Sequence, residues 1–147
     1  MPANPIAPWP RLARGAAGFP VRPLQYLLAA HGHHVAVDGI FGRETENAVE
    51  ALQRRTALVP DGIVGAQTWP ELVVRVKRGS RGDGVRAVQE VIRFHHQSDT
   101  PLRVADGFFG PHTEAWVRGF QRAVGTTPDG IVGPTTWRAL VSGMLSG

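Results

Sequence analysis

The chain has 147 residues, a formal net charge of +4 and no cysteine. Without cysteine, disulfides, a thiolate nucleophile and a zinc site with cysteine ligands are excluded. The positive charge favours anionic polymers such as nucleic acid or cell-wall material, but it carries little weight alone. No apolar run approaches the roughly 20 residues of a membrane-spanning helix, so we expect no membrane span.

The N-terminal stretch, residues 1–11, is predicted to be an irregular, proline-rich arm. Its first ten residues include four prolines, and Trp9 is the only candidate in the arm for docking on the rest of the chain. The stretch lacks the apolar core of a secretory signal peptide. We therefore expect that this chain does not encode export by the usual route.

An eight-residue phrase, D-G-[IF]-[FV]-G-x-x-T, occurs four times and organises the rest of the chain. Its copies span residues 38–45, 61–68, 106–113 and 129–136. The interval from position 38 to position 61 equals the interval from 106 to 129, so the copies form two identically spaced pairs. Such a pattern indicates a duplicated structural unit. We predict one repeat at residues 12–75 and a second at residues 76–147.

Each phrase predicts a loop that runs into a helix. The Asp side chain can accept hydrogen bonds from backbone N–H groups just ahead, and the following Gly reaches positive φ without strain. At least one of the two apolar residues that follow should enter a core. The second Gly stands where a helix N-cap belongs, and Pro follows it in Gly110-Pro111 and Gly133-Pro134, as is common at a first helical position. The Thr could return a hydroxyl hydrogen bond to the loop.

The aspartates of the four phrases could in principle serve catalysis or bind calcium. Glycoside hydrolysis needs two carboxylates in different environments, whereas these aspartates share one local sequence. A calcium loop needs several ligands at alternating positions, and each turn here offers one. We therefore predict a structural role in the loops and expect no catalytic residue, metal or cofactor. The aspartates are Asp38, Asp61, Asp106 and Asp129.

Helical periodicity predicts three helices in each repeat and hence an all-α fold of two tandem three-helix bundles. The first helix, at about residues 21–31, carries Leu24, Leu27 and Leu28 on one face and ends at Gly32. The second helix, at about residues 43–55, follows the first phrase directly. No stretch reads as a convincing strand, although short pairings around the Asp-Gly loops remain open.

The third helix of the first repeat should start late or be distorted, because Pro70 removes an intrahelical hydrogen bond. Trp69 and Trp137 keep helical spacing with the apolar residues after them, which indicates core positions rather than sugar stacking. In the second helix, Trp116 replaces Ala48. Smaller neighbouring residues in the second repeat lead us to predict that Trp116 fills the core of that repeat, with a contact between the repeats as the alternative.

Histidines gather in the run His-Gly-His-His at residues 31–34, and such a surface cluster sometimes binds zinc. The second repeat keeps a counterpart of His31 only, at His95, and no cysteine or aspartate completes a constant ligand set. We therefore expect no metal site in this run.

Two long runs of the sequence resemble the three-helix peptidoglycan-binding domain found beside bacterial cell-wall hydrolases. They are LQYLLAAHGHHVAVDGIFGRETENAVEALQRRTALVPDGIVGAQTWPEL and VQEVI…ADGFFGPHTEAWVRGFQRAVGTTPDGIVGPTTWRAL. Together the matches span about residues 12–143, nearly the whole chain. The resemblance implies non-catalytic binding to bacterial wall glycan or to its stem peptides, and it does not decide between them.

For the ligand we predict contacts at the exposed start of the second helix and its neighbours. Helix N-termini present free N–H groups to carboxylates or acetamido oxygens. Gln53 and Gln121 follow the last inward residue of this helix, so they could face a ligand or bond to the loop backbone. The predicted ligand-binding residues are Tyr26, Arg43, Asn47 and Gln53 in the first repeat and His112 and Gln121 in the second.

Several alternatives follow from the same observations. An enzyme would need a nucleophile or an acid–base pair outside the phrases, and we find none, so we expect no enzymatic activity. The chain could assist a separate wall hydrolase, or serve as a protein-interaction or structural part of a phage or phage-like particle. Nucleic-acid binding is the weakest alternative, because no helix shows a one-sided Arg face. We expect wall association if the chain is exported, and a cytoplasmic or particle-borne protein otherwise.

Overall fold

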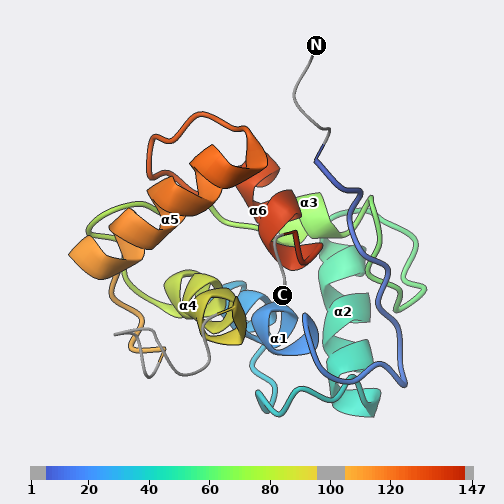
Figure 1. The fold of residues 1–147 in the computed structure, drawn as a ribbon. Coiled ribbons are helices and arrows are strands. Elements are labelled where there is room, and N and C mark those ends of the chain that lie inside the picture. Colours follow the sequence, from blue (N-terminus) through green and yellow to red (C-terminus); the bar gives the residue numbers. More distant parts are fainter. Residues whose placement is uncertain (1–5, 96–104, 145–147) are drawn as a thin grey trace.

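The computed structural model describes residues 6–95 and 105–144, and these ranges contain six helices and no strand (Figure 1). This confirms the predicted all-α fold with three helices in each repeat. None of the six helices is long and apolar enough to cross a membrane. The helices are α1 (Val21–Ala30), α2 (Arg43–Arg55), α3 (Trp69–Leu72), α4 (Asp83–His95), α5 (Pro111–Val124) and α6 (Pro134–Val141).

The first phrase forms the predicted loop and launches α2. The Asp38 Oδ1 atom accepts a hydrogen bond from the Ile40 backbone N–H at 2.9 Å, and Gly39 has a φ of 77°. Phe41 is 1% exposed while Ile40 is 58% exposed, so one of the two apolar residues enters the core. Gly42 is the N-cap in extended backbone. The loop-to-helix prediction is thereby confirmed.

The helix that follows the second phrase, α3, is shorter than its counterpart α6. It has 4 residues and α6 has 8. Residues 66–68 of the first repeat form a turn where the second repeat already begins its helix. Pro70 therefore falls within the first turn of α3, where its missing N–H removes no intrahelical hydrogen bond. The predicted late start of this helix is confirmed.

Short antiparallel bridges connect the segment that precedes α1 or α4 to both phrases of the same repeat. In the first repeat the Leu12 N–H donates to the Val64 carbonyl at 2.9 Å, and the Val64 N–H donates back at 2.8 Å. The second repeat has the same pairing between Val76 and Val132. The other two bridges join Ala17 to Ile40 and Arg81 to Phe108. We call the segment before α1 or α4 the lead-in of its repeat. Each lead-in therefore connects the two loop-to-helix units of that repeat.

Trp69 and Trp137 occupy equivalent places in the two cores, and both are fully buried. The Trp69 Nε1–H donates to the Pro10 carbonyl at 2.7 Å, and the Trp137 Nε1–H donates to the Val74 carbonyl at 2.6 Å. Trp9 stacks on Trp69 with ring centroids 5.9 Å apart. Both the core position of the two tryptophans and the docking of Trp9 are confirmed.

The two repeats pack against each other mainly through α1 and α4, which lie side by side at the centre of Figure 1. Arg22 of α1 donates to both carboxylate oxygens of Glu90 in α4, at 3.2 and 3.0 Å. Arg93 also donates to Glu90, at 3.0 Å. Glu90 is 7% exposed, so this charge is satisfied inside the contact between the repeats.

Trp116 does not fill the core of the second repeat, although the sequence analysis predicted that it would. Its ring is only partly buried, and it stacks on Phe120 with centroids 5.2 Å apart. The His95 ring lies 5.8 Å from it. Thr113, Val117 and Phe120 form the buried stripe of α5, and Trp116 lies at its edge. The smaller Ala48 is buried at the equivalent place of α2, and an indole is too large to enter that space completely. These ring contacts nevertheless stay within the second repeat.

Candidate functional site

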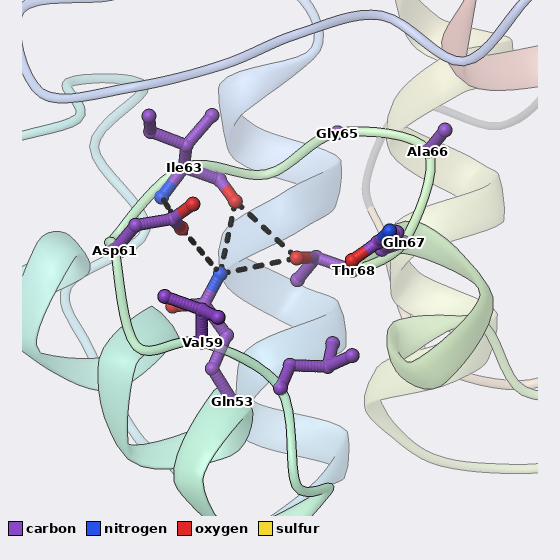
Figure 2. A pocket seen from close by; sticks show the side chains of 9 residues that line it. Gln53, Val59, Asp61, Ile63, Gly65, Ala66, Gln67 and Thr68 are labelled. Carbon is purple, nitrogen blue, oxygen red and sulfur yellow. Dashed lines mark hydrogen bonds between the residues drawn. The ribbon is translucent and has the colours of Figure 1, made fainter.

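The second phrase is organised around the side-chain amide of Gln53, which comes from α2 (Figure 2). The Gln53 Nε2 group lies 3.0 Å from Asp61 Oδ1, 2.9 Å from the Ile63 carbonyl and 3.1 Å from Thr68 Oγ1. Its Oε1 atom accepts a hydrogen bond from the Gly62 N–H at 3.0 Å. Gln53 thus ties the whole turn to the helix before it.

The same arrangement occurs at all four phrases. The Nε2 groups of Gln25, Gln89 and Gln121 contact the corresponding Asp, carbonyl and Thr at 2.9–3.4 Å. All four glutamines are at most 1% exposed. A buried amide with its donors and its acceptor satisfied makes a rigid loop rather than a costly polar defect. The carboxylates of the four aspartates take part in these loops.

Hydrogen bonds lower the pKa of two of these aspartates below the ordinary range. At Asp38 the largest cause is the bond from the Ile40 backbone N–H, followed by the bond from Gln25. At Asp106 the corresponding bonds from Phe108 and Gln89 lower the pKa in the same order. Donors directed at the charged form favour ionisation. A carboxyl held in the ionised state is suited to organising a turn and unsuited to acting as a general acid near neutral pH.

A pocket lies over the second phrase, and we name it the first pocket (Figure 2). Its volume is about 170 Å³. The walls come from the end of α2, the connecting segment and the turn before α3. The lining residues are Gln53, Leu58, Val59, Asp61, Ile63, Gly65, Ala66, Gln67 and Thr68.

An equivalent pocket, the second pocket, lies over the fourth phrase between α5 and α6. Its volume is about 430 Å³. It also takes in Arg75, from the segment that joins the two repeats. The other lining residues are Gln121, Gly125, Thr126, Thr127, Asp129, Ile131, Gly133, Pro134, Thr135 and Thr136.

The two pockets share one frame and differ at their rims. When the repeats are aligned on their phrases, Leu58 and Val59 of the first pocket correspond to Thr126 and Thr127 of the second. Val59 is 74% exposed, so its apolar side chain faces the solvent at the edge of the pocket. The first pocket therefore offers an apolar rim, and the second offers hydroxyl groups and a basic side chain.

The residues predicted to bind a ligand do not gather at one place. Arg43 and Asn47 are exposed and lie one turn apart on α2, and His112 is exposed at the start of α5. Tyr26 is partly buried against the core. For these four residues ligand contact stays a prediction.

Gln53 lines the first pocket and Gln121 lines the second, and both side chains are 1% exposed. Their amides are engaged by the loops, which is the second of the two roles that the sequence left open. Their amides are therefore not available to a ligand while the loops keep this arrangement.

Sequence reasoning missed the rims of the pockets. The sequence analysis predicted no ligand contact for Thr126, Thr127 or Arg75, although the positions just before the second and fourth phrases are places where the repeats diverge. It also missed Gln25 and Gln89. Their sequence separations from the Asp of the next phrase are 13 and 17, against 8 at Gln53, so no fixed spacing marks them.

The described histidines do not form a metal site. Within residues 6–95 and 105–144 no three His, Asp or Glu side chains are grouped to hold an ion. His31 Nε2 lies 2.8 Å from the Leu72 carbonyl, so this ring ties the end of α1 to α3. Burial is the main cause that lowers the pKa of His33, with Arg55 contributing.

Comparison with known proteins identifies the repeats. Residues 18–72 and 81–140 match the family described as "Putative peptidoglycan binding domain". The chain is 31% identical over 156 residues to N-acetylmuramoyl-L-alanine amidase CwlL of Bacillus licheniformis, covering 85% of this chain and 43% of the relative. It is 31% identical over 137 residues to the amidase CwlM of Mycobacterium tuberculosis, covering 79% and 31%.

Among solved structures, the crystal structure of the Burkholderia AP3 phage endolysin is similar in part. The match has a TM-score of 0.43 and 28% identity, and it covers 74% of this chain and 38% of the endolysin. The chain spans less than half the length of each of these three proteins. The likeness therefore concerns one part of each.

Proposed function

Since the chain belongs to the peptidoglycan-binding domain family, we propose that it is a non-catalytic module that binds the bacterial wall and anchors there any protein attached to it. The observation that supports this most directly is the pair of equivalent pockets, each built on a rigid glutamine-centred loop. Open pockets on preformed frames suit recognition of a repeating polymer, because binding then orders few groups.

The state of the aspartates supports a binding role rather than hydrolysis. Each carboxylate accepts hydrogen bonds from a glutamine amide and from a backbone N–H two residues ahead. Hydrolysis of a glycan would need one carboxyl kept protonated and another kept ionised. The four phrases instead give their aspartates one common environment.

We propose further that the module serves a wall hydrolase, either as part of a longer protein or as a separate partner. The named relatives include two amidases, and this chain matches less than half of each. In this role the module raises the local concentration of a catalytic domain at its polymer.

The exposed helix starts form a second proposed contact surface. Arg43 and Asn47 in the first repeat and His112 in the second are free of the core and face solvent. Amide chemical-shift changes on adding soluble muropeptides would include these residues if the surface takes part. Changes confined to the pockets would remove it from the binding site.

The direct test is co-sedimentation of the purified chain with insoluble peptidoglycan. We expect the chain to pellet with the wall and to release no soluble muropeptide. An unrelated protein of similar net charge is the control for non-specific attraction. Sedimentation no greater than that of the control would refute wall binding, and release of muropeptides would refute the non-catalytic role.

A further inference from the structure

The second pocket carries both signs of charge without pairing them. Arg75 and Asp129 line it, and both are exposed. They form no ion pair with each other, and within the described ranges Arg75 has no ion pair or side-chain hydrogen bond. A guanidinium and a carboxylate that share a pocket and leave each other free offer a binding place for an opposite pair of charges.

One oxygen of Asp129 stays open to a ligand. Its Oδ1 atom accepts hydrogen bonds from Gln121 Nε2 at 3.1 Å and from the Ile131 N–H at 3.0 Å. Its Oδ2 atom accepts none from the described residues. The loop therefore fixes the carboxylate in position through one oxygen, and the other can accept from a cation. A charged group held in place by its neighbours loses little entropy on binding.

The rim adds neutral hydroxyls from Thr126 and Thr127, and the volume of about 430 Å³ is in the range of small-ligand pockets. That space suits one or two amino-acid residues.

The first pocket lacks this combination of charges. None of the nine residues that line it is basic, and its rim is formed by Leu58 and Val59. Arg11 directly precedes the lead-in bridge of the first repeat, as Arg75 does in the second, but Arg11 does not line the first pocket. The duplication therefore provides a matched comparison in which the frame and its aspartate are kept and the basic residue is not.

We propose that the second pocket binds the part of a peptidoglycan stem peptide that carries a free carboxylate and a free ammonium group on one carbon. Arg75 receives the carboxylate and Asp129 Oδ2 receives the ammonium. A meso-diaminopimelate residue has this pair of groups on its second α-carbon, at the end of its side chain. The glycan strand consists of N-acetylated sugars and offers no such pair, so charge complementarity favours the peptide. This inference rests on the proposed wall-binding function and names the chemistry of its site.

The test is titration of the isotope-labelled full chain with L-alanyl-γ-D-glutamyl-meso-diaminopimelate, followed by amide chemical shifts. We expect shifts at residues 125–136 and none of similar size at residues 58–68. In the variant Arg75→Gln the affinity should fall at least about tenfold, as expected when a charge-assisted hydrogen bond is lost. The matched variant Arg11→Gln should stay within about twofold of the unaltered chain.

A second peptide separates recognition from a general structural effect. Replacing diaminopimelate by lysine keeps the terminal ammonium and removes the carboxylate beside it. The unaltered chain should prefer the diaminopimelate peptide, whereas Arg75→Gln should bind both peptides equally. A merely structural role of Arg75 would weaken both peptides alike and leave the preference intact, which would overturn the proposal.

Co-sedimentation with whole peptidoglycan distinguishes failure of the two ideas. A chain that does not pellet refutes the proposed function and this inference with it. A chain that pellets while the tripeptide shifts no residue of the second pocket refutes the inference alone. The same holds if N-acetylglucosaminyl-N-acetylmuramic acid without peptide shifts that pocket and the tripeptide does not.

Discussion

Arg22 of the first repeat and Glu90 of the second are joined by two hydrogen bonds, at 3.2 and 3.0 Å, across the packed faces of α1 and α4. Glu90 is the more buried partner, with 7% of its surface exposed. The hydrogen bond to Glu90 is also the main cause that raises the pKa of Arg22. We therefore expect this contact to make each repeat contribute to the stability of the other.

The variant Arg22→Ala should lower the free energy of unfolding by about 1–2 kcal/mol, because it leaves a mostly buried carboxylate with fewer donors. Arg86 is the matched control, since it occupies the equivalent position in the second repeat and pairs with Asp83 one turn away. Arg86→Ala should cost about 0.5 kcal/mol or less. Urea unfolding followed by circular dichroism measures both. Equal losses of stability would show that the Arg22–Glu90 ion pair contributes no more than a surface ion pair does.

Gln53→Ala should destabilise the first repeat by about 1–3 kcal/mol, because the groups that its amide satisfies lose their partner. Gln67 is the control in the same loop: it is exposed and lines the same pocket. Gln67→Ala should change the free energy of unfolding by less than about 0.5 kcal/mol. Thermal unfolding of both variants decides the matter, and similar midpoints would contradict a structural role for the buried amide.

Trp9→Ala should destabilise the first repeat by about 0.5–1.5 kcal/mol beyond its loss of buried area, through the stacked contact with Trp69. We also expect the emission of the remaining tryptophans to shift to longer wavelength, because Trp69 loses its cover. Unchanged stability and emission would mean that the arm docks without contributing to the fold.

Acid should weaken the fold through Asp38 and Asp106, whose pKa values hydrogen bonds hold below the ordinary range. Their stabilising effect is fully present above the unfolded-state pKa of about 3.9. It is lost as the pH falls through the lower pKa of the folded state, because protonation then favours the unfolded chain.

The double variant Asp38→Asn and Asp106→Asn should therefore show a smaller drop in melting temperature between pH 7 and pH 3 than the unaltered chain. Glu71→Gln is the control, since Glu71 is exposed and its side chain forms no ion pair with the described residues. A drop of the same size in all three proteins would exclude these two aspartates as the source of acid sensitivity.

The sequence by itself determined the repeats, the loop-to-helix phrases, the bounds of α2 and the late start of α3. These features depend on short-range chemistry: Gly at positive φ, Asp beside free N–H groups, and Pro in the first turn of a helix. Buried positions of Trp69 and Trp137 followed from helical periodicity for the same reason. Each of these signals lies within a few residues of the structure that it specifies.

Only the tertiary structure decided which side chains meet across the chain. Gln25 and Gln89 reach their loops over sequence separations of 13 and 17, which are set by connecting segments of unequal length. Trp116 lies at the edge of the buried stripe of α5, whereas the smaller Ala48 is buried at the equivalent place of α2. Arg75 joins Asp129 in one pocket although α4 and α5 lie between them in the sequence. Long-range neighbours of this kind arise from how the helices pack, and local sequence patterns do not encode them.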